Sequence, residues 1–459
     1  MKKTYVTDMT EGEPLGLLVS FMLPLLIGNI FQQLYNMVDS IIVGQYVGAD
    51  ALAAVGATGS LNFLIFSLCG GMANGTGVVI SQHFGAGKND QVKNTIINAA
   101  YIMLFCAVLM GSIGVIFARK ILIFLNTPDN ILDSSTLYMT IICCGILGVS
   151  LYNAVSAILR AVGDSKTPLY FLMVSSVINI VLDLLFIRSF SWGVAGAAFA
   201  TIIAQFVSGV GSLVFALVKN PFFKIEKEYR SLNRGIIWQC IRMGVPLAFQ
   251  SSLIAISCVA LQSVVNTFGS VVVAAFTATS RIEQLVQQPY NSLGMSVSTY
   301  TGQNIGAGQL ERVKKGYRIA FLLMALFSFT MLPLAQFFGN PIMRLFVSEP
   351  EVIEMGAHAL KLTSWFYLPL GMIYITRGLL NGAGDATFAF MNGIIEMLGR
   401  ICFAKPLTLI PQVGVWGVWL ATAFTWTLTG VITFLRYLQG KWKKHVTPKE
   451  VKQEELAKA

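Results

Sequence analysis

Four polar side chains recur along one helical face near the start of the chain. Gln32, Tyr35, Asn36 and Asp39 follow the i, i+3, i+4, i+7 spacing within an apolar stretch that begins near Leu15. A carboxylate inside a membrane span costs about 2.5 to 3.5 kcal/mol on insertion scales, so it is rarely kept there without a task. Since carboxyl groups in such positions form proton relays, Asp39 is the first candidate for a coupling group.

Further polar residues lie later in the same half of the chain. Asn179 and Asp183 are one helical turn apart, Asn153 lies in the preceding apolar segment, and Thr201 lies in the following one. Together with Tyr35 and Asp39, these side chains could close one polar cavity in a helical bundle. The alternative for Asp183 is an ion pair with Arg188 near the outer surface.

The composition indicates which elements position these residues. The chain has 459 residues, is 55% hydrophobic and only 12% charged, and has a mean hydropathy of +0.68, as expected of a polytopic membrane protein. The predicted fold is an all-α integral membrane protein with about twelve transmembrane helices and no room for a soluble enzyme domain. The predicted spans are 15–43, 51–80, 95–117, 136–159, 168–188, 194–218, 240–267, 271–300, 317–338, 356–380, 386–410 and 414–438.

Basic residues concentrate in alternate loops, which predicts the orientation of the chain. The N-terminus has no cleavable signal pattern, so the first span is expected to be retained, with both termini cytoplasmic and the protein in the plasma membrane. The net charge of +10 then reflects topology and anionic lipid, not nucleic acid. The basic residues of the cytoplasmic side are Lys2, Lys3, Lys88, Lys93, Arg160, Lys166, Lys224, Lys227, Arg230, Arg234, Arg312, Arg318, Lys441, Lys443 and Lys444.

The cysteines, the histidines and the GAGK sequence do not have the spacing of a metal site or of a phosphate-binding loop. The seven cysteines lie in apolar segments without metal-ligand spacing, and the three histidines are scattered. The GAGK sequence that ends at Lys88 lacks the first glycine and the final Ser or Thr of a phosphate-binding loop. We therefore expect no cofactor, no metal and no enzymatic activity.

The chain repeats itself at a shift of 221 positions. SQHFGAGK at Ser81 returns as GQNIGAGQ at Gly302, RAVGD at Arg160 returns as NGAGD at Asn381, and GVAGAAFAT at Gly193 returns as GVWGVWLAT at Gly414. Each copy holds six predicted spans, so both enter the membrane from the same side as parallel repeats. The predicted organisation is an N-lobe over 1–218, a cytoplasmic linker over 219–235, a C-lobe over 236–440 and a cytoplasmic tail over 441–459.

The two halves differ in their membrane charges. At the repeat shift, Asp39 faces Ala260 or Leu261, Asp183 faces Ala404, and Asn179 faces Arg400. The C-half instead carries Glu283 with Arg281, and Glu396 four residues before Arg400. We favour mutual salt bridges that lock this half; the alternative gives Glu283 to a cationic substrate, with Gln284 and Gln287 lining the cavity.

These motifs together resemble the multidrug and toxic compound extrusion (MATE) family over almost the whole chain. PLLIGNIFQQLYNMVDSIIVG, the two GAG loops and the RAVGD and NGAGD turns carry the resemblance. It implies a two-lobe transporter that alternates between outward and inward states and expels lipophilic cations against proton or sodium entry. The polar N-half set is similar to the proton-linked site of the DinF-like bacterial branch. That set comprises Asp39, Asp183, Asn179, Tyr35, Thr201 and Asn153.

The resemblance also indicates which ion drives transport and which compounds are transported. The sodium-linked branch uses acidic residues in the seventh and tenth spans, whereas this seventh span offers Gln250, Gln262 and Asn266. We therefore expect proton coupling, with sodium as the alternative, and a monomer whose partners are small organic cations and membrane lipid. A flippase for lipid-linked precursors is the second function class, and an integral-membrane enzyme is the third. The predicted substrate-binding residues are Gln32, Asn36, Glu283, Gln284 and Gln287.

Prolines suggest where the first span could move. Pro14 and Pro24 lie at its start, and Pro246 and Pro289 mark the matching region of the second half. A proline removes a helix hydrogen bond, so the span could bend when the Asp39 cluster takes up a proton. The alternative is that both prolines belong to the helix start and bend nothing.

Overall fold

The computed structural model describes residues 6–125 and 127–445, and no strand occurs among them. Lys2, Lys3 and residues 446–459 of the predicted tail therefore lie outside the described residues. The chain divides into two compact units. The first contains residues 6–8 and Leu23–Ala248, and the second contains Met9–Met22 and the chain from Phe249 onward. Each unit is described by itself below.

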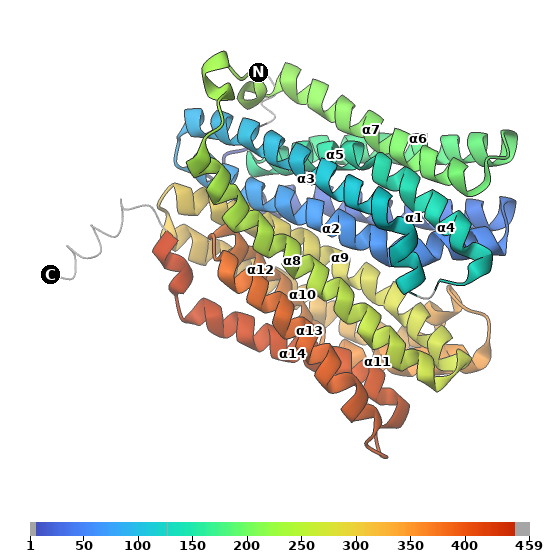
Figure 1. Ribbon diagram of the computed structural model, residues 1–459. Coiled ribbons are helices and arrows are strands. Elements are labelled where there is room, and N and C mark those ends of the chain that lie inside the picture. Colours follow the sequence, from blue (N-terminus) through green and yellow to red (C-terminus); the bar gives the residue numbers. More distant parts are fainter. Residues whose placement is uncertain (1–5, 126, 446–459) are drawn as a thin grey trace. The chain divides into compact units, whose positions relative to one another are not determined.

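The first unit is built from helices that pack in an antiparallel bundle. α5 lies beside α7, and α3 lies beside α5, as Figure 1 shows. A short π-helix, Leu184–Ser189, continues α6, and two 3-10 turns, Pro221–Phe223 and Lys227–Arg230, follow α7. The helices are α1 (Pro14–Tyr46), α2 (Ala49–Gly85), α3 (Asn89–Phe124), α4 (Asp129–Cys144), α5 (Ile146–Ala161), α6 (Lys166–Asp183), α7 (Gly193–Lys219) and α8 (Arg234–Val265).

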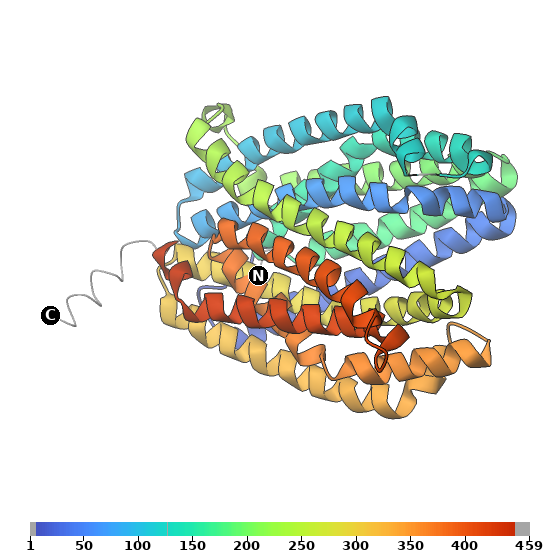
Figure 2. The same cartoon turned by 60° about the horizontal axis from the view of Figure 1, so that its bottom comes forward.

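The second unit contains the remaining helices together with the start of α1, up to Met22, and the end of α8, from Phe249. α9 lies beside α12, and α13 lies beside α14 (Figure 2). 3-10 turns over Asn266–Phe268 and Gly414–Trp416 precede α9 and α14, and another covers Lys441–His445. The helices are α9 (Ser270–Gly306), α10 (Leu310–Arg344), α11 (Pro350–Ser364), α12 (Tyr367–Gly382), α13 (Ala386–Thr408) and α14 (Gly417–Leu438).

The all-α membrane fold predicted from composition is confirmed. In the described ranges, nine single helices are long and apolar enough to cross a membrane, and α4 with α5 forms a tenth span bent by 47°. α9, which carries Arg281 and Glu283, and the broken pair α11 and α12 complete the twelve predicted segments. Several helices run longer than predicted, because their apolar cores continue into polar turns, as α3 does from Asn89.

The sequence repeat is present in the backbone. α2 and α9 have the same length, as do α5 and α12, and each pair is offset by 221 positions. Both GAG loops end a helix in the same way: Gly87 N–H donates to the Phe84 carbonyl and Lys88 N–H to that of His83. The same two bonds recur at Gly308, which has a φ of +76° against +69° at Gly87. This pattern is the Schellman motif, in which glycine adopts the left-handed conformation after a helix.

The RAVGD and NGAGD turns are a second pair of such caps. Gly163 and Gly384 have φ of +88° and +91°, and the following Asp164 and Asp385 donate their N–H groups to carbonyls five residues back. Asp164 then caps α6, because its carboxylate accepts from the N–H groups of Lys166 and Thr167, both at 3.0 Å. The repeated motifs are thus helix stops followed by helix starts.

The N-terminal segment forms hydrogen bonds with the RAVGD turn in the first unit and with the end of α9, before the second GAG loop, in the second unit. In the first unit, Thr7 N–H donates to the Val162 carbonyl at 3.2 Å. In the second unit, Met9 is fully buried; its N–H donates to Gln303 Oε1 at 2.8 Å, and its carbonyl accepts from Asn304 Nδ2 at 3.1 Å. The polar residues of the GQNIGAGQ loop therefore satisfy backbone groups that an apolar loop would leave unpaired.

Small residues allow close helix packing inside the first unit. A Cβ added to Gly71 would lie 2.3 Å from the Ala248 Cα, and one added to Gly75 would lie 2.3 Å from the Gly244 Cα. α2 and α8 therefore approach backbone to backbone, as small-xxx-small pairs do in membranes.

Two helices that contain a proline, α1 and α8, are shared between the units. Pro24 lies inside α1 and Pro246 lies inside α8. The division between the units falls between Met22 and Leu23 in α1 and between Ala248 and Phe249 in α8, within two or three residues of each proline. Since a proline removes one helix hydrogen bond, each shared helix is weakest where it passes from one unit to the other.

We predict that Gly163→Ala destabilises the protein more than Gly87→Ala. Both glycines have positive φ, which costs an alanine about 1 to 2 kcal/mol, but an added Cβ at Gly163 would also lie 2.1 Å from the Thr7 carbonyl oxygen. Gly87 has open space there. Apparent melting temperatures of the two purified variants test this, and equal losses would show that the Thr7 contact contributes nothing.

Candidate functional site

The polar residues predicted in the N-half meet inside the first unit. Asp183 at the end of α6 is fully buried, and its carboxyl lies close to that of Asp39 on α1, near enough for the two groups to interact. Two carboxylates cannot donate to each other, so this contact forms a hydrogen bond only when one of the pair holds a proton. We call Asp39 and Asp183 the carboxyl pair.

The surroundings of the carboxyl pair leave it without other donors. Asp39 Oδ1 and both Asp183 oxygens receive no hydrogen bond from the described part of the chain. Asn179 donates to Thr201 Oγ1 at 3.5 Å, and its own Oδ1 is likewise unpaired. A buried acceptor without a donor is costly, so this group of oxygens favours binding of a proton or a small cation.

Tyr35 connects the carboxyl pair to its neighbours. Its hydroxyl interacts electrostatically with both carboxyl groups and lies near the Gln32 and Gln205 side chains. Gln32 and Tyr35 therefore belong to one polar cluster with the pair. Their position one turn apart on α1 is the helical face expected from the spacing.

Other expected members lie apart from the cluster. Asn153 on α5 donates to the Val149 carbonyl of its own helix at 2.9 Å, and no contact joins it to the carboxyl pair in the described residues. Asn36 is exposed on α1. The ion pair between Asp183 and Arg188, our alternative, does not occur within the described ranges; the Arg188 guanidinium lies 5.8 Å from the Tyr46 ring centroid.

Two cluster residues were missed by sequence reasoning. Tyr138 on α4 is buried and interacts electrostatically with Asp39, Asp183 and Tyr35. Gln205 on α7 reaches Tyr35. Gln205 is four residues after Thr201 and could have been found by helical spacing, whereas nothing in the sequence near Tyr138 pointed to α1.

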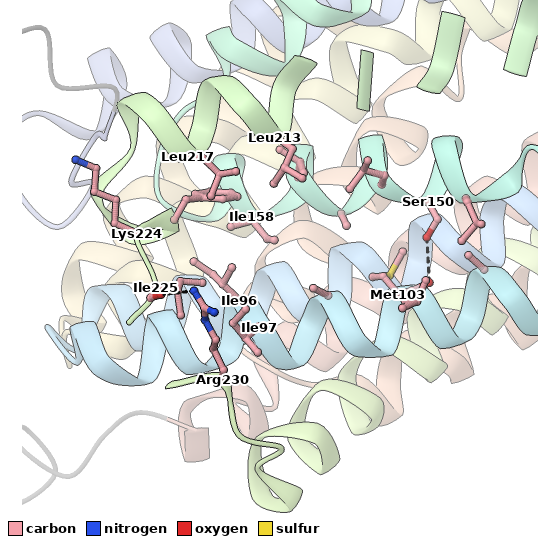
Figure 3. Close-up of a pocket in the computed structure, with 18 residues that line it drawn as sticks. Ile96, Ile97, Met103, Ser150, Ile158, Leu213, Leu217, Lys224, Ile225 and Arg230 are labelled. Carbon is pink, nitrogen blue, oxygen red and sulfur yellow. Dashed lines mark hydrogen bonds between the residues drawn. The ribbon is translucent and has the colours of Figure 1, made fainter. Parts of the chain in front are cut away.

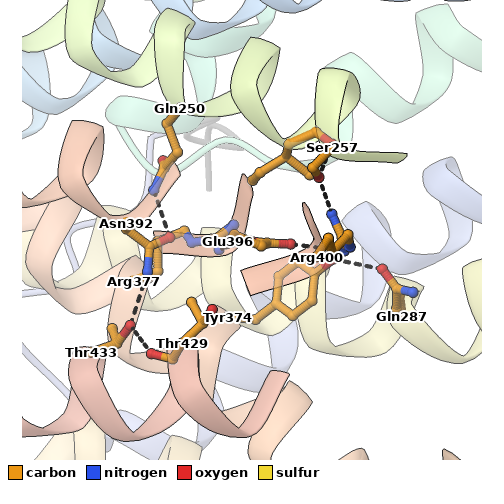
Figure 4. Close-up of polar contacts among 11 residues, drawn as sticks. Gln250, Ser257, Gln287, Tyr374, Arg377, Asn392, Glu396, Arg400, Thr429 and Thr433 are labelled. Carbon is orange, nitrogen blue, oxygen red and sulfur yellow. Dashed lines mark hydrogen bonds and ion pairs between the residues drawn. The ribbon is translucent and has the colours of Figure 1, made fainter. Parts of the chain in front are cut away.

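The second unit has a buried ionic cluster instead of a carboxyl pair. Glu396 lies between two guanidinium groups, at 2.8 Å from Arg377 and 3.0 Å from Arg400 (Figure 4). Arg400 also donates to Ser257 Oγ at 2.5 Å. The predicted pair of Glu396 with Arg400 is confirmed, and Arg377 is an additional partner that the sequence analysis did not identify.

A polar network extends this ionic cluster across the unit. Gln250 donates to Asn392 at 3.1 Å, and Asn392 donates to Thr433 at 2.9 Å (Figure 4). Tyr374 donates to Gln287 Oε1 at 2.9 Å. Because Gln250 takes part in this network, its presence in the seventh predicted span has a structural explanation.

The remaining candidates of the second unit lie around this network. Glu283 on α9 is buried and interacts electrostatically with Arg400, but Gln284 and Arg281 on the same helix are exposed. Arg281 and Glu283 form no ion pair within the described residues. A substrate role for Glu283, Gln284 and Gln287 stays a prediction.

A duplicated bundle of membrane-spanning helices with a polar cluster in its first unit is the architecture of a helical membrane transporter. The family model MatE matches residues 24–185 and 246–404. The chain is 30% identical over 446 residues to "Probable multidrug resistance protein YpnP" of Bacillus subtilis (strain 168), covering 95% of this chain and 97% of the relative.

Two further comparisons extend this similarity. The chain is 25% identical over 434 residues to "FAD transporter" of Shewanella oneidensis, covering 92% of this chain and 94% of the relative. A solved multidrug resistance MATE family transporter of the MOP superfamily, in an outward-facing conformation, matches with a TM-score of 0.90 at 23% identity, over 97% of this chain and 99% of that one. This chain belongs to the MATE family; it is a multi-pass membrane transporter and not an enzyme.

We predict that Glu396→Gln lowers the apparent melting temperature more than Arg377→Met. The first change leaves two buried guanidinium groups without their shared carboxylate, and breaking a buried pair costs about 3 to 5 kcal/mol. The second keeps the pair of Glu396 with Arg400 intact. The account of Glu396 as the centre of the cluster fails if Arg377→Met is the more damaging change.

Proposed function

We propose that this transporter exports lipophilic or cationic organic compounds from the cell in exchange for an inward flow of protons. The relative named as a multidrug resistance protein, aligned over nearly the whole chain, supports the substrate class. The buried carboxyl pair of Asp39 and Asp183 is the single observation that supports the coupling.

The carboxyl pair can link the two flows because its charge changes with its occupant. With one shared proton the pair carries one negative charge, and that charge attracts an organic cation. Entry of a second proton from outside removes the charge and weakens the attraction. The organic cation and the second proton therefore compete, so proton entry promotes release of the substrate.

The neighbours of the pair have complementary parts in this exchange. Tyr35 and Gln32 on α1 connect Asp39 to Gln205 on α7, and Asn179 connects α6 to Thr201 on α7. A change of charge at the pair therefore alters the interactions of three helices, α1, α6 and α7. Asn153 lies apart from these contacts, and we assign it no step in the exchange.

Bending of α1 is the conformational change we propose. Asp39 lies on the part of α1 that belongs to the first unit, and Pro24 lies at the start of that part. The second proton removes the remaining charge of the pair, and with it the attraction that holds the substrate beside α1, which frees α1 to bend toward α6. To change the ratio of two states from 1:99 to 99:1 takes about 5.5 kcal/mol, and protonation together with lost substrate contacts would supply it.

Sodium is the alternative coupling ion. The unpaired oxygens of Asp39, Asp183 and Asn179, with the Thr201 hydroxyl, are hard oxygen ligands of the kind that small cations prefer. Protons remain our proposal, because the seventh span offers Gln250, Gln262 and Asn266 in place of the acidic residues that the sodium-linked branch uses there.

A second substrate class, organic anions, is favoured by a separate observation. In the second unit, two guanidinium groups meet one carboxylate in the Glu396 cluster, and Arg377 Nε has no hydrogen-bond partner in the described residues. The relative named as an FAD transporter fits such a substrate. A lipid-linked precursor flippase is less favoured, because the first-unit cluster offers carboxyl and amide groups to a phosphate.

The orientation belongs to the same proposal. With protons entering from outside, the basic linker that contains Lys224, Lys227, Arg230 and Arg234 lies in the cytoplasm together with both termini. The expected location is the plasma membrane, and the expected state is a monomer.

We predict that Asp39→Asn abolishes export of ethidium from proteoliposomes driven by a proton gradient alone. Asparagine keeps the size of the side chain but cannot exchange a proton. Asp50→Asn is the matched control, because Asp50 is an exposed carboxylate in the first turn of α2. Export by Asp39→Asn at the rate of the control would contradict the proposal.

The same proteoliposomes distinguish the alternatives. Wild-type export that needs an imposed sodium gradient would assign the carboxyl pair to sodium. Transport of a flavin nucleotide, with no transport of ethidium, would assign the protein to organic anions and direct attention to Arg377.

A further inference from the structure

A cavity of about 510 Å³ lies in the first unit, away from the carboxyl pair. It is bounded by α3, α5, α7 and the linker that follows α7, and Figure 3 shows its side chains. Its walls are almost entirely apolar. The lining residues include Ile96, Ala100, Ala107, Leu147, Ile158 and Leu213. Its volume falls within the range of about 300 to 1,000 Å³ that is typical of ligand sites.

The cavity has the depth of one membrane leaflet. Along α3 it extends from Ile96 to Ala107, and the eleven steps between these residues span roughly 16 Å at 1.5 Å per step. Half of a bilayer's hydrocarbon core is about 15 Å. The cavity therefore runs from the edge of the membrane to about its middle.

The side of the cavity opens toward the hydrocarbon. Leu104, Leu147 and Leu217 line it and are 55%, 45% and 45% exposed. On a membrane-spanning bundle, such leucines meet lipid tails. An apolar chain can thus enter laterally from the bilayer without crossing water.

The membrane-edge end of the cavity is positively charged. Lys224 and Arg230, both exposed, line this end (Figure 3). Neither makes an ion pair within the described ranges, and the Arg230 guanidinium donates to the Ile225 carbonyl at 3.4 Å, a long contact. Of the nearby acidic groups, Glu226 pairs with Lys93 at 2.8 Å and Asp90 accepts from Tyr229 at 2.8 Å, while the exposed Glu228 lies beside Tyr229.

We infer that this cavity binds an anionic phospholipid of the leaflet on the linker side. One acyl chain lies between α3, α5 and α7, and the phosphate contacts Lys224 and Arg230. Organic cations are poor candidates, because the basic end repels them. Free phosphate is also a poor candidate, because most of the cavity is apolar. The site joins α3 to the linker before α8, so lipid stabilises that connection.

Binding of phosphatidylglycerol and phosphatidylcholine to the purified full-length protein, measured by native mass spectrometry, tests the inference. We expect wild type to prefer phosphatidylglycerol. Lys224→Ala/Arg230→Ala should raise its Kd about thirtyfold, because each basic residue near an anionic lipid contributes about a factor of five. Lys227→Ala/Arg234→Ala is the control: it removes the same charge from exposed residues of the linker that do not line the cavity.

A second variant tests the apolar part of the site. Ala100→Trp would fill the cavity from α3, where Ala100 is exposed, and should reduce binding of both lipids while leaving the basic end intact. Equal phosphatidylglycerol binding by wild type, the Lys224/Arg230 variant and Ala100→Trp would overturn the inference. Displacement of bound lipid by inorganic phosphate at equal concentration would also overturn it, because the site would then recognise only the anion.

Discussion

A buried pair of carboxyl groups cannot carry two negative charges without a partner, and the rest of the proposed mechanism depends on this constraint. The half-buried Asp39 and the fully buried Asp183 lie close to each other, and the buried oxygens of the pair receive no hydrogen bond from other described residues. Coulomb repulsion between such groups is strong at low dielectric, so a proton or another cation must be bound nearby. The need for a cation at this point makes the first unit suited to coupling.

The two units have similar helices and helix caps, but the charged residues in their interiors differ. The helix caps at Gly87, Gly163, Gly308 and Gly384 keep the same geometry in both copies. In the second unit, Glu396 is neutralised by Arg377 and Arg400, so its charge is fixed by protein partners. The carboxyl pair of the first unit lacks such partners. The repeat therefore preserves the backbone of the helices and their caps. The residues that differ between the two copies leave the first unit with carboxyl groups that can bind and release a proton.

Sequence patterns predicted those features that depend on local or repeated structure. The spans followed from apolar length, the caps from glycine at a fixed shift, and the pair of Glu396 with Arg400 from its four-residue spacing. Tyr138, Gln205 and Arg377 were missed, because their contacts come from helices whose neighbours are set by tertiary packing. Asn153 was included for its polarity, yet its amide bonds to its own helix. Polarity identifies candidates, but helix packing decides which of them meet.

The most direct test is the number of protons released when the substrate binds. Calorimetric titration of the purified protein with ethidium, in buffers of different ionisation enthalpy at one pH, gives this number. At a pH low enough for the free pair to hold two protons, the account predicts that the wild type releases about one proton for each ethidium bound, since ethidium and the second proton compete for the pair. It also predicts that Asp39→Asn/Asp183→Asn, which has no carboxyl group left in the pair, releases none. A wild-type binding enthalpy that is the same in every buffer would contradict the account.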